Sequence, residues 1–295
     1  MTDYAIKIVD AFTSVPFAGN PCGVVTRAEG LSDAQMQAIA REMNLSETAF
    51  VFPSERAGFR VRFFTPRAEI PLAGHPTIAT MFTLADEGRI PLTAGHARVT
   101  QETGAGVLPV DIVANPGGGF RVVMTQAAPV FLHEIDRVAA AAALRLSVED
   151  LHPSLPAQVV STGTPQGMIP VGSLDVLRRL RPDFEALAAL EASGGFFSTH
   201  VFTTETLDPA HATHARHYLG AQGFEDPVTG SATGGMAAYL WRHGVRRQPA
   251  FVAEQGHLMG RPGLVDVEVE GAGDTPTTVR IAGTAVTVLR GTISA

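Results

Sequence analysis

Residues 62–76 read Arg62-Phe63-Phe64-Thr65-Pro66-Arg67-Ala68-Glu69-Ile70-Pro71-Leu72-Ala73-Gly74-His75-Pro76, and a later stretch follows the same plan. That later stretch begins with Arg216-His217-Tyr218 and, after a longer loop, continues as Glu225-Asp226-Pro227-Val228-Thr229-Gly230-Ser231-Ala232. Each stretch predicts a strand, a turn with the pattern Glu-x-Pro-x-x-Gly, and a helix of small residues. A helix N-terminus presents unpaired N–H groups and partial positive charge, so it attracts carboxylates. The repeat therefore predicts two helix N-termini that face one cleft and could hold a small acid.

The composition is that of an ordinary globular protein, and it excludes several functions. Of the 295 residues, 45% are hydrophobic and 17% are charged, and the formal net charge is -7 without a long basic run. We expect no nucleic-acid binding, because phosphate contacts need clustered lysine and arginine. Cys22 is the one cysteine, so no intrachain disulfide can form. The N-terminus lacks an apolar signal core and no apolar run reaches about 18 residues, so we expect a cytoplasmic protein without a membrane span.

The order of elements predicts an α+β fold with two pseudo-symmetric halves, each a curled, mostly antiparallel sheet around one central helix. The central helices are expected at 75–84 and 231–241, where small and apolar residues leave no broad polar face. The predicted domains are residues 1–127 and 128–283, and the C-terminal strand at about 284–295 is a candidate addition to the first domain. A cleft between two such domains is a natural site for a small molecule.

Glu47 stands where a helix pattern meets an apolar strand, in the run Asn44-Leu45-Ser46-Glu47-Thr48-Ala49-Phe50. Partial loss of hydration favours the neutral form of a carboxyl group, and this suits it to exchange protons near neutral pH. From the pattern alone, a solvated surface glutamate at a helix–strand junction, with Ser46 as a local cap, is the commoner case, because most carboxylates are simply solvated.

His75 and Asp226 occupy the two predicted turns. Beside the positive end of a helix the charged imidazole is disfavoured, so a neutral His75 could bond to a substrate or pass a proton, or it could satisfy backbone groups as an N-cap. Asp226 could accept a proton, orient His75 or bind an amine, although Asp-Pro is also an ordinary turn. Thr229, Gly230 and Ser231 could donate hydrogen bonds to a carboxylate, or the two hydroxyls could cap the helix.

A metal site is not expected. His211, His214 and His217 have a spacing that would suit ligands on a helix. The repeat instead makes Thr213–Leu219 a strand, on which His214 and His217 point to opposite faces. A usable site needs three convergent ligands. No glycine-rich fingerprint follows a strand, and Cys22 has no basic neighbour in the sequence, so neither a nicotinamide cofactor nor a thiol nucleophile is expected.

Taken in order, several segments make the chain similar to the PhzF family, the phenazine-biosynthesis isomerases and their relatives. These segments are Asp10-Ala11-Phe12-Thr13 with Pro16-Phe17-Ala18-Gly19-Asn20-Pro21, Asn44-Leu45-Ser46-Glu47-Thr48, Phe63-Phe64-Thr65-Pro66 with Glu69 and Gly74-His75, Glu225-Asp226-Pro227-Val228-Thr229-Gly230-Ser231-Ala232, and Gln255-Gly256 with Gly260-Arg261. The resemblance spans the whole chain, and five motifs in the right order are specific where no single one is.

The resemblance implies the fold of diaminopimelate epimerase, with the active site between two similar domains. It makes Glu47 the acid/base group and His75 and Asp226 its catalytic neighbours. The substrate contacts that it implies are Ser46, Gly74, Gly230, Ser231 and Ala232. The implied reaction is an isomerisation without cofactor or metal in a homodimer, in which Glu47 takes a proton from one carbon of a small carboxylic acid and returns one to a different atom on the same face.

Two alternatives stay open at this point. The two-base epimerases of this fold place a cysteine at each helix N-terminus, whereas this chain has Ala73 and Thr229, so the two-thiol mechanism is unavailable. An epimerase or racemase that acts through a carboxylate and His75 would need no thiol. A small-acid-binding protein without turnover is the non-enzyme alternative, although Glu47, His75 and Asp226 are all present.

Overall fold

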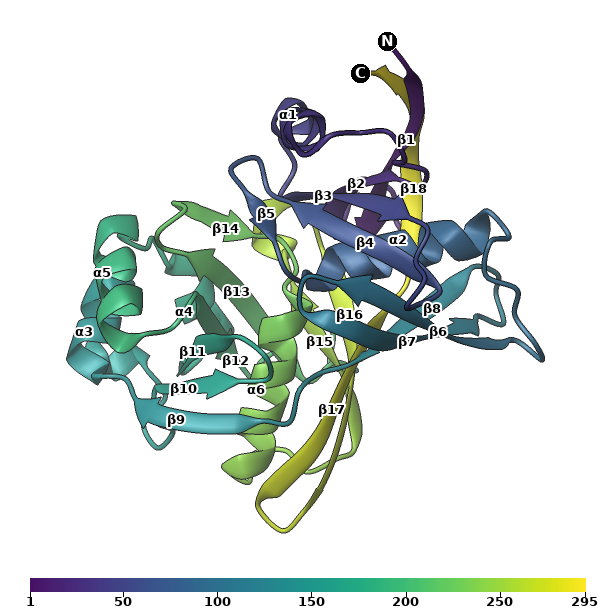
Figure 1. Cartoon of the computed structure of the whole chain (residues 1–295). Coiled ribbons are helices and arrows are strands. Elements are labelled where there is room, and N and C mark those ends of the chain that lie inside the picture. The colour runs from purple at the N-terminus through teal and green to yellow at the C-terminus, as the bar shows by residue number, and fades with distance from the viewer. The chain divides into compact units, whose positions relative to one another are not determined.

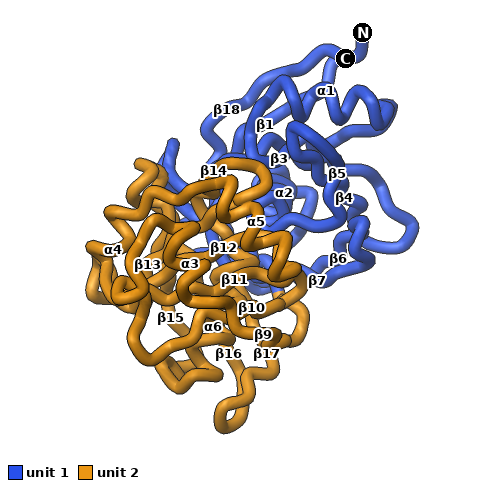
Figure 2. Tube along the Cα trace, turned by 90° about the vertical axis from the view of Figure 1, so that its left-hand side faces the viewer, with its two compact units in different colours: residues 1–124, 282–295 blue, residues 125–281 orange.

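The computed structural model describes residues 1–295 (Figure 1). Its strands form two sets, and the strands of each set pair with one another in the same order along the chain. Contacts along the chain separate two units, one of residues 1–124 with 282–295 and one of residues 125–281 (Figure 2). The domain limits drawn from the sequence lie close to these positions and stay a prediction. No helix is long and apolar enough to cross a membrane.

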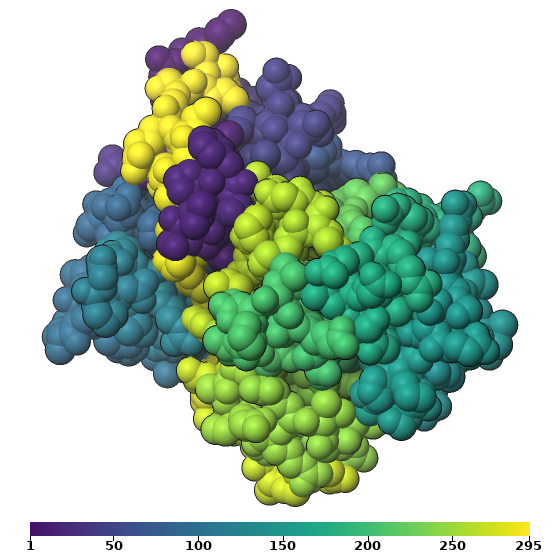
Figure 3. Space-filling model, turned by 180° about the vertical axis from the view of Figure 1, so that it is seen from behind, coloured from purple at the N-terminus to yellow at the C-terminus, as the bar shows by residue number.

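The first unit contains nine strands and two helices. They are β1 (Asp3–Ala11), β2 (Asn20–Val25), α1 (Asp33–Met43), β3 (Glu47–Phe52), β4 (Phe59–Phe64), β5 (Glu69–Ile70), α2 (Gly74–Asp86), β6 (His96–Thr103), β7 (Gly106–Ala114), β8 (Phe120–Thr125) and β18 (Ala285–Ser294). In Figure 3 the yellow C-terminal strand lies against the purple N-terminal segment, because β18 pairs antiparallel with β1 along the length of both strands.

The second unit contains nine strands, four helices and two 3₁₀ turns. They are β9 (Val130–Glu134), α3 (Arg137–Ala143), η1 (Val148–Asp150), β10 (Gln158–Ser161), β11 (Pro165–Pro170), α4 (Leu174–Arg179), α5 (Phe184–Gly194), β12 (Thr199–Thr203), β13 (Thr213–Leu219), β14 (Phe224–Asp226), α6 (Gly230–Arg242), β15 (Ala250–Gln255), η2 (His257–Met259), β16 (Gly263–Ala272) and β17 (Thr275–Gly283).

The pairings repeat from one unit to the other. In the first unit β1 and β2 are antiparallel, β2 and β3 parallel, β3 and β4 antiparallel, and β4 then pairs with β5 and, in parallel, with β6. In the second unit β10, β11, β12, β13, β14 and β15 follow the same scheme. The central helix enters at the same point of each scheme, α2 after β5 and α6 after β14. The predicted α+β fold with two similar halves is therefore confirmed.

Each central helix is buried along its length, as its sequence predicts. In α2 every residue from His75 to Ala85 is buried. In α6 the adjacent Gly234 and Gly235 would each cost about 1 kcal/mol relative to alanine in a helix interior. Close packing explains them, because a Cβ on Gly234 would meet the side chain of Gln126 at 1.9 Å and one on Gly235 would meet Met168 at 2.8 Å.

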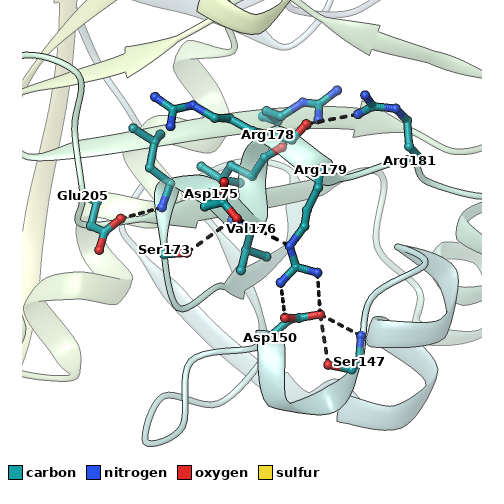
Figure 4. Close-up of polar contacts among 12 residues, drawn as sticks. Ser147, Asp150, Ser173, Asp175, Val176, Arg178, Arg179, Arg181 and Glu205 are labelled. Carbon is teal, nitrogen blue, oxygen red and sulfur yellow. Dashed lines mark hydrogen bonds and ion pairs between the residues drawn. The ribbon is translucent and has the colours of Figure 1, made fainter.

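The shorter helices of the second unit begin at side-chain caps. At the start of α4 the Ser173 hydroxyl accepts a hydrogen bond from Val176 N at 3.3 Å, and the Glu205 carboxylate accepts one from Leu174 N at 2.7 Å (Figure 4). Near its end Arg179 forms an ion pair with Asp150, which ties α4 to η1. The bonds to Ser173 and Glu205 satisfy two backbone N–H groups that the start of a short helix leaves unpaired.

One element differs from the sequence prediction. The alanine-rich run Glu134–Leu144 predicts a single helix, but α3 begins only at Arg137, after Asp136 accepts a hydrogen bond from Ala139 N at 2.7 Å. Glu134 is instead the last residue of β9 and pairs with Gln158 of β10, and Ile135 and Asp136 connect the strand to the helix. Strand pairing there outweighs local helix propensity.

Candidate active site

Two arginine–glutamate pairs fix the turns of the repeat. In the first unit Arg62 donates to Glu69 through Nε at 2.7 Å and through Nη2 at 2.6 Å. In the second unit Arg216 donates to Glu225 through Nε at 2.8 Å and through Nη2 at 2.7 Å. These bidentate pairs link each strand to the short strand opposite it. The repeat seen in the sequence is thus a repeat of side-chain geometry.

The first half-site consists of Glu47 and His75. Glu47 is the first residue of β3, and it lies opposite Cys22 in the parallel pairing of β2 with β3. His75 lies in the first turn of α2, directly after Gly74. Its Nε2 is 3.2 Å from Oε2 of Glu47, and the side chains are 7% and 18% exposed. Glu47 and His75 are 28 positions apart in the sequence, and the packing of α2 against β3 brings their side chains together.

His75 is neutral at neutral pH. Burial lowers the pKa of the imidazole to about 3, although a hydrogen bond to the Pro21 carbonyl favours the protonated form. The sequence predicts a neutral His75 from the positive helix end, whereas the main physical cause is desolvation. The N-cap of α2 is Ala73, which has no side-chain cap, so His75 does not cap the helix.

Burial also decides the state of Cys22. It raises the pKa of this thiol, and the negative charge of Glu47 adds to the effect. Cys22 is therefore a protonated, buried thiol beside Glu47, and this agrees with its interpretation as a small core residue.

The second half-site is the turn that carries Asp226. Thr229 donates its hydroxyl to the Asp226 carboxylate in a short hydrogen bond. Gln255 spans the turn, since it accepts from Thr229 N at 3.0 Å and donates to the Asp226 carbonyl at 2.8 Å. Thr229 is the N-cap of α6 but makes no side-chain cap. The Thr229 hydroxyl is bonded to Asp226 instead. Neither Thr229 nor Ser231 therefore caps the helix, which was one of the two roles that the sequence left open for them. The first backbone N–H groups of α6 have no side-chain cap.

Ser231 belongs to a polar group that the sequence analysis missed. Gln166 Nε2 lies 3.3 Å from the Ser231 hydroxyl and 3.3 Å from the Ser198 hydroxyl. Gly167 of β11 pairs with Thr199 of β12, as Gly23 of β2 pairs with Thr48 of β3 in the first unit. Gln166 and Ser198 are the residues directly before Gly167 and Thr199. By this register Ser198 stands where Glu47 stands, and Ser231 stands where His75 stands.

A visible signal could have identified Gln166. The first unit reads Asn20-Pro21-Cys22-Gly23 and the second reads Thr164-Pro165-Gln166-Gly167. The shared Pro-x-Gly aligns Gln166 with Cys22, and a polar residue at this point of a repeat indicates a polar site rather than core.

Two buried histidines lie behind Asp226. His217 is opposite Asp226 in the pairing of β13 with β14, and its Nδ1 is 3.2 Å from Nδ1 of His200. Burial lowers the pKa of His200 to about 3, and burial with the neighbouring His200 lowers the pKa of His217. His214, on the other face of β13, contacts Glu254. The predicted strand at Thr213–Leu219 and the opposite orientation of His214 and His217 are confirmed.

The remaining predicted substrate contacts lie at the ends of elements. Ser46 directly precedes β3 and is half-buried, Gly74 and Gly230 are the first residues of α2 and α6, and Ala232 is buried in the first turn of α6. Their contact with a substrate stays a prediction.

Comparisons with known proteins concern the whole chain. Residues 9–291 match the phenazine biosynthesis-like protein family, PhzC-PhzF. The uncharacterized isomerase CA_C3446 of Clostridium acetobutylicum is 39% identical over 297 residues, with 97% of each protein covered. The trans-2,3-dihydro-3-hydroxyanthranilate isomerase of Pseudomonas fluorescens is 34% identical over 294 residues, which cover 97% of this chain and 98% of that protein. The crystal structure of a PhzF-family protein from Bacillus anthracis superposes with a TM-score of 0.91, at 35% identity and with 100% of both chains covered.

Proposed function

The chain belongs to the phenazine biosynthesis-like family, whose named relatives include isomerases, and on this premise we propose that it moves a proton within a small carboxylic acid, with Glu47 as the acid/base group. The contact of 3.2 Å between Glu47 and the neutral His75 is the observation that carries this proposal. No cofactor takes part in the proposed reaction.

The first half-site supports a one-base mechanism. Glu47 removes a proton from a carbon of the substrate, and the electron pair left behind shifts along an adjacent double bond. The protonated carboxyl group then donates toward Nε2 of neutral His75, which is within reach of hydrogen bonding. Glu47 returns the proton to a different atom on the same face. The substrate and the product have the same atoms, so the step needs no oxidant or reductant.

The second half-site supports binding of a carboxylate. The uncapped N–H groups of α6 and the Ser231 hydroxyl are donors, and a helix N-terminus favours negative charge. Gln166 donates to Ser231, so the hydroxyl hydrogen of Ser231 is free to point to a substrate. Asp226 is proposed to orient the reacting group or to accept its proton. That both half-sites act on one molecule, and that the protein is a homodimer, stay predictions of the resemblance.

Incubation of the protein in D₂O with small hydroxylated or unsaturated carboxylic acids tests the function. The first candidate is the dihydro-hydroxyanthranilate named for the relative of P. fluorescens. Proton NMR should show loss of one carbon-bound proton signal and migration of a double bond. Inversion at one carbon without migration would instead support the non-thiol epimerase. Binding of acids with no exchange in any of them would contradict the proposal.

A further inference from the structure

A buried amide, that of Gln255, ties the end of β15 to the turn that carries Asp226. Gln255 is 2% exposed, and its Oε1 accepts a hydrogen bond from Thr229 N at 3.0 Å. Its Nε2 donates to the Asp226 carbonyl at 2.8 Å and to the Thr229 hydroxyl at 3.2 Å. The next residue, Gly256, lies so close to the turn that a Cβ there would meet the Pro227 carbonyl oxygen at 2.7 Å. Both ends of the Gln255 amide are therefore bound to one turn.

The backbone of the turn fixes the orientation of this amide. A backbone N–H can only donate a hydrogen bond, and a carbonyl oxygen can only accept one. The bond from Thr229 N therefore requires the amide oxygen, and the bond to the Asp226 carbonyl requires the amide nitrogen. The side of the Gln255 amide that faces the Thr229 hydroxyl is thus the donor side.

The fixed amide sets the direction of the next hydrogen bond. Because Nε2 of Gln255 donates to the Thr229 hydroxyl, that oxygen acts as an acceptor and its own hydrogen points elsewhere. The acceptor of this hydrogen is the Asp226 carboxylate. Asp226 is thus held as an acceptor, as suits an ionised carboxylate, since a carboxyl group with its proton on this oxygen would have to donate.

The first unit shows that the fold forms the same turn without these bonds. By the strand register and the helix starts, three of its residues are equivalent to the members of the network: Ile70 to Asp226, Ala73 to Thr229 and Thr103 to Gln255. Ile70 and Ala73 have apolar side chains. The Thr103 hydroxyl bonds to the carbonyl of Gly106 and to Ala105 N, each at 3.2 Å, within its own hairpin. The network of the second unit therefore serves Asp226 rather than the fold.

We propose that Gln255 is a positioning residue, which acts through the Thr229 hydroxyl to hold the Asp226 carboxylate as a hydrogen-bond acceptor. In this state Asp226 can orient a donor group of the substrate or accept a proton from it, and it enters the reaction without a proton to give. The role of Asp226 in a reaction rests on the proposed function. The network itself consists of printed contacts within the second unit only.

Carbon-13 NMR of aspartate carboxyl groups tests the network without a substrate. Protein labelled at the aspartate side-chain carboxyl carbon is titrated from pH 8 to pH 3, and Asp226→Asn identifies the signal of Asp226. Thr229→Val keeps the shape of the side chain and removes the hydroxyl. The pH midpoint of Asp226 should then rise by about one unit or more, because the carboxylate loses a hydrogen bond. Thr229→Ser keeps the hydroxyl and should titrate as the wild type does.

A double-variant comparison tests whether Gln255 acts through Thr229. Gln255→Glu keeps the acceptor for Thr229 N and removes both donors, so the new carboxylate takes the hydroxyl hydrogen from Asp226 and adds a negative charge. In the Thr229→Val background only the charge remains. The shift of the Asp226 midpoint caused by Gln255→Glu should therefore be smaller there, by about half a pH unit or more. Gln248→Glu, the same change at an exposed position, should shift nothing.

Other charged groups around the turn are the same in all these variants. They are Glu225 beside Asp226 on β14, His217 opposite it on β13, Glu254 next to Gln255 on β15, and Arg261 in the loop after η2. The first turn of α6 has no charged side chain. Differences between the variants therefore report the bonds of Gln255 and Thr229.

Kinetics with a substrate identified for the wild type give a second readout. Thr229→Val and Gln255→Glu should lower kcat about tenfold or more and change KM less than about threefold, and Thr229→Ser should restore kcat. Lack of turnover in the wild type would contradict the proposed function, and the NMR titration would still decide the role of Gln255. Equal Asp226 midpoints in the wild type and Thr229→Val, or equal shifts by Gln255→Glu in both backgrounds, would overturn the proposal.

Discussion

At the scale of single residues, the two halves of the repeat differ in chemistry at matching positions. The strand register makes Ser198 of the second unit equivalent to Glu47 of the first, and Gln166 equivalent to Cys22. Ser231, the second residue of α6, is equivalent to His75, the second residue of α2. The first set can exchange a proton, because it pairs a carboxyl group with a neutral imidazole. The second set contains hydroxyl and amide groups, which can donate hydrogen bonds but do not ionise at neutral pH. The proposed function accordingly assigns proton transfer to the first set and substrate binding to the second.

Gln166→Glu should weaken substrate binding. Gln166 donates to the Ser231 hydroxyl, whereas a glutamate would accept the Ser231 hydrogen and repel a carboxylate substrate. We expect KM to rise about tenfold or more with a smaller change in kcat, which corresponds to a loss of about 1.4 kcal/mol in binding. Steady-state kinetics measure both constants. Exposed Gln248→Glu makes the same chemical change and should alter neither, and an unchanged KM in Gln166→Glu would show that Ser231 does not bind the acid.

At the scale of elements, the sequence predicted most strands and both central helices but not every boundary. The apolar run at Glu47–Phe52 predicts a strand by its composition, and the internal repeat predicts one at Thr213–Leu219. The structure forms strands at both places. The helix predicted from Glu134 begins only at Arg137, because Glu134 pairs with Gln158 as the end of β9 and Asp136 caps the helix. Long-range pairing of this kind has no local signal.

The same limit applies to the site. Residues inside the repeated motif, such as His75 and Asp226, could be selected from the sequence alone. The contact between Glu47 and His75 depends on the packing of α2 against β3, which no spacing in the sequence encodes. Gln166 and Ser198 could be found only by extending the repeat to its preceding strands.

Glu225→Gln should destabilise the protein more than Glu69→Gln. Arg216 and Glu225 are 11% and 15% exposed, and Arg62 and Glu69 are 16% and 43% exposed. Loss of the Glu225 charge leaves a largely buried guanidinium with only the Leu177 and Leu180 carbonyls, which costs about 2 kcal/mol or more. Arg62 keeps the carboxylate of Asp33, and the more exposed pair contributes under about 1 kcal/mol. Urea unfolding of both variants measures the difference. A larger loss in Glu69→Gln would contradict this ranking.

At the scale of the whole molecule, buried neutral histidines make stability depend on pH. The pKa of His200 is about 3 in the folded protein because the ring is buried, and an unfolded histidine titrates near 6.5. Between these values the unfolded chain binds protons that the folded chain does not. The free energy of unfolding therefore falls as the pH falls below about 6.5.

Replacement of the buried pair by the residues at matching positions of the first unit should reduce this dependence. His200→Ala with His217→Phe copies Ala49 and Phe63, which pair in the same way. Each histidine removed should lessen the loss of unfolding free energy between pH 7 and pH 5 by about 2 kcal/mol. Urea unfolding at both pH values tests this, with exposed His133→Ala as the control. The same loss in the double variant and the wild type would contradict the assignment of the acid sensitivity to this pair.

The most direct test of the central claim is deuterium exchange by Glu47→Gln with a substrate identified for the wild type. Glutamine keeps the shape of the side chain and cannot take up a proton, so the variant should bind the acid with nearly unchanged Kd. Its exchange of the carbon-bound proton with D₂O should fall about 100- to 10,000-fold, the usual contribution of a general acid/base group. Glu55→Gln, which changes an exposed carboxylate of the same unit, should exchange at the wild-type rate. Wild-type exchange in Glu47→Gln would contradict the account.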